Sequence, residues 1–492
     1  MILEFNTSIL LLVCILSALF GFFFSKNTLS VSSYLNAGRS IKSKSLTASI
    51  VASCFGVWIL IGPAEAATWG GMGAILGYAL GQACPYLAMR TFGKRLRSIM
   101  PKGNSLTQFV FARFGKKMLK IILLLSLFYM FVYLCAEVTA IAKVTNLITG
   151  LPLWQTSLLI LVTTLIYTLK GGLRISILTD KVQFIIISIF LIFIFYFLFF
   201  SGKINISFDL IQSKASNLIS LNYFYGYTAG LTFFIAVFAT NLFDQGIWQR
   251  IFAASSTEDL RVGFRNSFLI VLPVILILGF CGIVAVSLGQ VEDPSTIIFS
   301  LLLGQGGKYL STAVLVLALT LVISSMDTLI NGISSLLVID GSEFIKHNSK
   351  ISYLNFSRII LVLVSIVVFY IASKGLSVLY MFLLADLLCC AAVIPVFYGM
   401  FKGDTNEQVS VLSICSGLLA GLMLFPDISF QKSILVGLLF DAELFPVWIS
   451  SALLFWSFIF ATFVPLVVIL LGRNNNKKYD FRKIKALINE IK

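Results

Sequence analysis

Polar residues interrupt long apolar stretches at a few places, and these places carry the chemistry that the sequence can support. The stretch 52–67 contains Gly56, Gly62 and Pro63, which weaken a helix and free backbone carbonyls. Unwound backbone at membrane depth is tolerated where protein or an aqueous cavity covers it, and such carbonyls are good ligands for Na⁺ or a polar substrate. A merely kinked helix, whose freed groups are satisfied by its neighbours, is the alternative interpretation.

Two further apolar stretches place oxygen atoms where a small cation could use them. Asn241, Asp244 and Gln245 put a carboxylate and two amides near membrane depth, where a carboxylate is costly unless it is paired or bound to a cation. The alternative is that the span ends earlier and Asp244 lies at the interface. Ser324 and Ser325 are adjacent hydroxyls midway along an apolar run; they could complete a cation shell, or simply bond back to their own helix.

The other acids inside apolar runs are Glu65, Glu137 and Asp386, while Asp180 is expected at the cytoplasmic mouth of a run. Each is a candidate proton, ion or substrate group. The single histidine, His347, lies in a polar loop, and the eight cysteines show no metal-type spacing. Because no set of residues for nucleophilic or metal-assisted catalysis is present, we do not expect an enzyme.

The composition shows which elements must position these groups. Of the 492 residues 59% are hydrophobic and only 12% are charged, roughly half the ~25% of a soluble domain. A soluble enzyme, a disordered chain and a disulfide-stapled module are therefore excluded, and an all-α polytopic membrane protein is predicted. A spanning helix needs ~20 apolar residues. About 13 transmembrane helices are expected, at 7–24, 47–69, 74–92, 118–147, 155–170, 176–201, 223–249, 264–289, 308–340, 355–373, 377–401, 408–425 and 446–472, with a further partial helix at 433–440.

The distribution of basic residues predicts the orientation. With these spans, 29 of the 34 loop lysines and arginines lie on one side, which is a strong positive-inside signal. The N-terminus is therefore expected outside and the C-terminus in the cytoplasm of a cell that holds the protein in its plasma or inner membrane. The net charge of +15 is explained by these loops, so no nucleic acid is expected as a partner.

The positions of the two interrupted spans predict the topology. They lie five spans apart and run in opposite directions, as in inverted-repeat transporters whose site lies between broken helices. The expected units are 1–46 (N-terminal helix and loop), 47–201 (first repeat), 202–222 (external loop), 223–401 (second repeat), 402–472 (two C-terminal helices) and 473–492 (basic tail). The tail is amphipathic from Tyr479; a helix on anionic lipid and a plain solubilising tail are both compatible with it.

Four motifs resemble those of the sodium:solute symporter family. They are YLNAGRS at 34–40, YTLKGGLR at 167–174 followed by TDKVQ at 179–183, DQGIWQR at 244–250, and SSMDTLIN at 324–331. The resemblance implies a LeuT-type 5+5 inverted repeat with one extra N-terminal and two extra C-terminal helices. It also implies a sodium site formed by the carbonyls of Ala52, Phe55 and Leu321 and the hydroxyls of Ser324 and Ser325. Asp180 matches a family acid that is tied to sodium dependence, as a second ion or coupling group.

The expected function is sodium-coupled import of a small polar organic solute by alternating access, with Na⁺ and the lipid bilayer as the other partners. A monomer suffices for this, and an oligomer is compatible with it. Proton coupling in the same fold is the alternative, and a sensor or channel a remote one. A urea-like, amino-acid or carboxylate substrate is considered; Cys54 stands where proline-type members carry an acid, and Ala385–Cys389 resembles urea-type members. The substrate candidates are Cys54, Trp58, Glu65, Asn241, Asp244, Gln245 and Asp386.

Overall fold

The computed structural model describes residues 2–24, 35–204, 206–220, 222–291, 293–341, 353–430, 432–439, 445–474 and 479–488. Tyr34 of the first motif, His347 and the tail residues 475–478 and 489–492 lie outside this part of the chain. The described residues form helices, and no strand is found among them. The predicted all-α class is therefore confirmed.

The helices follow the apolar runs of the sequence. The longer ones are α1 (Ile2–Phe24), α3 (Ser43–Cys54), α4 (Gly62–Ile99), α5 (Leu106–Phe114), α6 (Lys116–Thr149), α7 (Leu153–Phe200), α10 (Phe224–Phe243), α11 (Gln245–Ala253), α12 (Thr257–Leu288), α13 (Ile297–Gly341), α14 (Tyr353–Ala372), α15 (Val378–Phe401), α16 (Glu407–Leu424) and α19 (Leu453–Gly472). The short ones are η1 (Ala37–Arg39), η2 (Val57–Leu60), α8 (Phe208–Lys214), α9 (Ser216–Ile219), η3 (Pro294–Thr296), α17 (Ile434–Leu439), α18 (Val447–Ser450) and α20 (Arg482–Leu487). The partial helix expected at 433–440 is α17.

Several expected spans are joined without a loop. Residues Gly71 in α4, Gly172 in α7 and Gly307 in α13 have positive φ values of 55°, 60° and 61°, which glycine adopts without a steric penalty. Each of these helices therefore changes direction at one residue. Among the described residues, nine helices are long and apolar enough to cross a membrane on their own, and shorter apolar helices and broken ones accompany them. The total of 13 spans stays a prediction.

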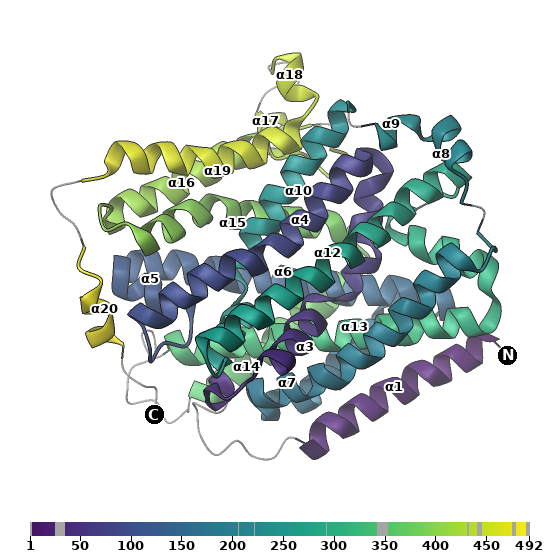
Figure 1. Ribbon diagram of the computed structural model, residues 1–492, viewed down its shortest axis with the longest axis horizontal. Coiled ribbons are helices and arrows are strands. Elements are labelled where there is room, and N and C mark those ends of the chain that lie inside the picture. The colour runs from purple at the N-terminus through teal and green to yellow at the C-terminus, as the bar shows by residue number, and fades with distance from the viewer. Residues whose placement is uncertain are drawn as a thin grey trace.

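The long helices run side by side, close to the long axis of the molecule (Figure 1). The N-terminus, α8 and α9 lie at one end, and α5, α20 and the C-terminus lie at the other. Helix α4 packs mainly against α12 and α10, and α13 packs mainly against α7 and α6. The two expected repeats thus interlock, because α4 and α7 belong to one and α10, α12 and α13 to the other.

The end of the tail packs against protein rather than standing free. The Tyr479 hydroxyl donates a hydrogen bond to the carbonyl of Ala112 at 2.6 Å, and the guanidinium of Arg113 lies 4.5 Å from the Tyr479 ring centroid. Ile484 in α20 is fully buried. The apolar face predicted for the tail therefore covers α5 and the C-terminal end of α4, which is neither of the two arrangements considered from the sequence.

Candidate functional site

The second expected span is broken, and its backbone hydrogen bonds show how. In a continuous helix, the N–H groups of residues 56–59 would donate to the carbonyls of residues 52–55. Instead the Gly56 N–H donates to the Cys54 carbonyl at 3.1 Å and the Ile59 N–H to the Gly56 carbonyl at 3.3 Å. The carbonyls of Ala52 and Phe55 therefore lack their helical donors, between the end of α3 and the start of η2.

Glu137 of α6 accepts hydrogen bonds from backbone N–H groups that follow the break. Its carboxylate accepts the Val57 N–H at 2.9 Å and the Trp58 N–H at 3.4 Å, and its side chain is fully buried. A Cβ atom on Gly56 would lie 2.2 Å from the Glu137 carboxylate oxygen, so only glycine leaves room for this approach. The sequence marks Glu137 as an intramembrane acid, but does not assign it to the site.

The two serines of α13 each donate a hydrogen bond to a different buried carboxylate. Ser325 donates to Glu137 Oε2 at 2.9 Å, the oxygen that also accepts from Val57. Ser324 donates to Asp180 Oδ1 at 2.9 Å. A serine hydroxyl that donates its proton keeps the lone pairs of its oxygen available to a cation. Ser325 has a second contact within hydrogen-bond distance, to the Val322 carbonyl of its own helix at 3.1 Å.

Asp180 is buried inside a network that contains an arginine. Arg250 contacts Asp180 Oδ2 at 2.8 Å through one guanidinium nitrogen and the Ser49 hydroxyl at 2.8 Å through another. The Ser49 hydroxyl donates to the same Asp180 oxygen at 2.5 Å. The count of loop residues from the sequence included Arg250 among the basic residues of the cytoplasmic side, and this is wrong, because Arg250 lies on α11 with 1% of its surface exposed. Asp180 has no exposed surface, so protein encloses it and it does not line an open mouth.

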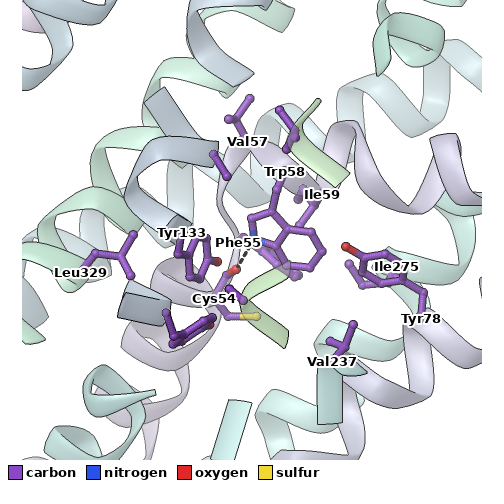
Figure 2. Packing of buried hydrophobic residues seen from close by; sticks show 14 of the residues in the cluster. Cys54, Phe55, Val57, Trp58, Ile59, Tyr78, Tyr133, Val237, Ile275 and Leu329 are labelled. Carbon is purple, nitrogen blue, oxygen red and sulfur yellow. Dashed lines mark hydrogen bonds between the residues drawn. The ribbon is translucent and has the colours of Figure 1, made fainter. Parts of the chain in front are cut away.

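A cavity lies between the two interrupted helices. The space inside it for the centres of water-sized atoms is about 50 Å³, room for roughly three to five water molecules. Five of the seven substrate candidates line it. They are Cys54, Trp58, Asn241, Asp244 and Asp386. Figure 2 shows Trp58 between Tyr133 and Tyr78, with Cys54 beside it and the Trp58 indole N–H bonded to the Cys54 carbonyl at 3.1 Å.

Polar groups hold the walls of the cavity in place. Gln82 and Asn241 form a reciprocal amide pair at 3.1 and 3.2 Å, and Gln82 also contacts the Cys54 sulfur at 3.0 Å. Asp244 interrupts α10 and α11 and caps α11 by accepting the Ile247 N–H at 3.2 Å. The break expected there is present, and the Asp244 side chain is buried; its position at membrane depth stays a prediction. An oxygen of Asp386 lies 2.7 Å from the Thr240 hydroxyl.

The remaining two candidates lie away from this cavity. The Gln245 amide donates to Ser335 at 3.1 Å and to the Asn104 carbonyl at 3.3 Å, so it belongs to the end of the molecule near α5. Glu65 lines a separate cavity with Trp69 and Phe430, and its Oε2 atom has no hydrogen-bond partner among the described residues.

Comparison with known proteins finds a family model and transporters that match this sequence. The model of the sodium:solute symporter family matches residues 34–417. The "Spermidine transporter DUR31" of Candida albicans is 26% identical over 422 residues, which cover 84% of this chain and 78% of the relative. The "Urea active transporter" of Saccharomyces cerevisiae is 22% identical over 502 residues, covering 94% and 67%.

Two solved structures show the fold. A Na⁺-coupled sialic acid symporter in a substrate-bound outward-open state superposes with a TM-score of 0.73 at 16% identity, covering 94% of this chain and 96% of that one. Mhp1, a nucleobase-cation-symport-1 family transporter in a closed conformation, gives a TM-score of 0.53 at 14% identity, covering 94% and 100%. The predicted LeuT-type fold is confirmed.

Proposed function

The chain belongs to the sodium:solute symporter family, and on that premise we propose that it imports a small polar organic solute together with Na⁺. Its relatives are transporters and not enzymes, and the described helices make it a multi-pass membrane protein. We further propose that the two inverted units, 47–201 and 223–401, move against each other around the central cavity, and that the C-terminus is cytoplasmic.

The observation that supports Na⁺ coupling is the arrangement around the broken second span. The carbonyls of Ala52 and Phe55 lack their helical donors, and the hydroxyls of Ser324 and Ser325 direct their protons to buried carboxylates. With the Leu321 carbonyl these atoms make the five-oxygen site that we propose for Na⁺. Carboxylates that orient the ligands and add negative charge behind them are a familiar outer-shell device.

We propose that Asp180 serves this site by orienting Ser324. A second Na⁺ on Asp180 would have to compete with the Arg250 guanidinium, which already contacts it at 2.8 Å. Coupling to one Na⁺ suffices energetically. One inward charge gains ~2.3 kcal/mol per 100 mV, and a tenfold sodium gradient adds ~1.4 kcal/mol, so roughly 10²- to 10³-fold accumulation is supported.

The names of the two relatives refer to a polyamine and to urea, which are a cation and a neutral polar molecule. The two carboxylates that line the cavity, Asp244 and Asp386, repel anions. For this chain we therefore propose a neutral or cationic nitrogen-containing solute in preference to a carboxylate.

The test is ²²Na⁺ binding to purified protein in nanodiscs, which needs no knowledge of the substrate. Losing one oxygen ligand costs ~1–3 kcal/mol, like the loss of a buried polar partner, so Ser324→Ala and Ser325→Ala should weaken sodium binding roughly 10- to 100-fold. Ser365→Ala is the matched control, because that buried hydroxyl bonds only to the Leu361 carbonyl of its own helix at 2.8 Å. Wild-type sodium affinity in both site variants would refute the assignment. Proton-driven uptake in sodium-free buffer would instead support the proton-coupled alternative.

A further inference from the structure

We propose that the central cavity binds an organic cation that carries an amine, guanidinium or ammonium group. Asp386 is the principal counter-charge for this cation, and an arc of aromatic rings forms the wall of the cavity. This inference rests on the proposed function, since it takes the cavity to be the substrate site.

The first step is the balance of buried charge. Five acids are buried on the helices around the cavity and the proposed sodium site: Glu137, Asp180, Asp244, Asp327 and Asp386. Among the described residues, one buried base accompanies them, Arg250, and it pairs with Asp180. The buried residues Arg113 and Asp340 lie at the end near α5, where Asp340 accepts the Thr107 hydroxyl proton and Arg113 donates to the Gly399 carbonyl, so they belong to a different part of the molecule. An unpaired carboxylate at membrane depth is costly, so bound cations are the expected partners of this acidic interior.

Asp386 is the carboxylate that is best placed to hold a cation in the cavity. One of its oxygens lies 2.7 Å from the Thr240 hydroxyl, which lies equally close to the Ala236 carbonyl of its own helix. A hydroxyl contact of this kind orients the carboxylate without neutralising it. Asp244 lies in the same cavity, but its carboxylate also caps α11 through the Ile247 N–H. No lysine or arginine lines the cavity within the described part of the chain.

The aromatic wall supplies the second element of cation recognition. Successive ring centroids are 5.8 Å apart from Tyr78 to Trp58, 6.3 Å from Trp58 to Phe382, 5.1 Å from Phe382 to Tyr133 and 5.8 Å from Tyr133 to Tyr129. All five residues line the cavity, and Figure 2 shows three of them, with Trp58 between Tyr133 and Tyr78. A cation within about 6 Å of an aromatic face is attracted by the quadrupole of the ring, and recognition sites for organic cations commonly gather several such rings.

The remaining step is the comparison with uncharged and anionic solutes. A neutral amide of similar size would satisfy hydrogen bonds but would leave Asp386 without a counter-charge, and a carboxylate would add a further negative charge. A hydrogen bond between charged partners is roughly twice as strong as a neutral one. The cavity therefore favours a cation over a neutral molecule of the same shape.

The experiment uses guanidinium and urea, which share a planar shape and differ in charge, with putrescine, choline and acetate as further probes. Binding is measured by calorimetry on the full-length protein in nanodiscs at saturating NaCl. We expect guanidinium or one of the amine probes to bind about 10- to 100-fold more tightly than urea, and acetate not to bind. Asp386→Asn should abolish that preference while ²²Na⁺ binding persists, and Asp209→Asn, an exposed acid on α8, should change neither.

Three results would overturn the inference: tighter binding of urea or acetate than of every cationic probe, an unchanged preference in Asp386→Asn, or no binding of any cationic probe by protein that binds ²²Na⁺. In each case intact ²²Na⁺ binding leaves the proposed sodium symport standing. Loss of ²²Na⁺ binding in the wild type would instead refute the proposed function.

Discussion

At the scale of single residues, the site depends on buried carboxylates that accept hydrogen bonds from several helices and so hold them in place. Glu137 holds the amides of Val57 and Trp58 and the hydroxyl of Ser325. It thereby joins α6, the broken second span and α13 at one point. Gly56 makes this possible, because any side chain there would meet the carboxylate. The opening of the backbone at Ala52 and Phe55 is thus stabilised by a side chain from another helix.

This arrangement predicts a specific rescue. Gly56→Ala places a Cβ atom 2.2 Å from Glu137, so the carboxylate must move and ²²Na⁺ binding should weaken by about tenfold or more, as for a lost charged hydrogen bond. Glu137→Asp, whose side chain is shorter by one methylene, should make the Gly56→Ala change less harmful than it is alone, since residues in contact are not additive. The measurement is sodium affinity across the double-mutant cycle. Additive effects would show that the two residues do not act through this contact.

At the scale of elements, the two repeats meet where helices approach backbone to backbone. Gly73 and Gly77 of α4 face Gly226 and Gly230 of α10, and a Cβ on Gly77 would lie 1.9 Å from the Gly230 carbonyl oxygen. Small residues four apart on both helices are the usual way in which membrane helices pack closely. This contact places the interrupted parts of both repeats beside the same cavity.

We therefore expect Gly77→Leu to separate α4 from α10. Overpacking typically costs ~1–3 kcal/mol, and here the obstacle is backbone, which cannot rotate away. The variant should show a lower midpoint of thermal unfolding by fluorescence-detected size-exclusion chromatography, with loss of solute binding. Leu76→Ala changes the neighbouring residue, which is 38% exposed, and serves as the control. Equal stability of the two variants would contradict a close contact in the folded protein.

At the scale of the whole molecule, different elements lie at the two ends of the helix bundle. The N-terminus, α8 and α9 lie at one end, and α5, α20 and the C-terminus at the other (Figure 1). At the second end Arg113 donates to the carbonyls of Gly399, Lys402 and Thr405 and packs against Tyr479. The basic tail is thereby held against α5 and the loop after α15.

The predicted orientation can be tested by labelling. Cysteines placed at Lys214 and Lys432 should react with a membrane-impermeant maleimide on intact cells, and a cysteine at Lys102 only after permeabilisation, because all three positions are exposed. The wild-type protein measures the background from its native cysteines. Labelling at Lys102 from outside would mean that the positive-inside rule gives the wrong orientation here.

Composition and local sequence pattern were enough to predict the class of protein and the positions of its interrupted helices. Apolar runs of spanning length predicted a helical membrane protein, and Gly56, Pro63 and Asp244 marked the two interrupted helices, because helix weakening and intramembrane charge are local properties. The four motifs predicted the family. The partners of each polar group, in contrast, follow from the tertiary structure. Glu137 bonds to the opened backbone and Arg250 to Asp180, while Gln245 and Glu65 lie outside the cavity. Each of these placements is determined by the packing of helices that are far apart in the chain. The residues in contact are about 70 to 200 positions apart in the chain, so only packing brings them together. One sequence carries no local signal for which face of a helix meets which neighbour.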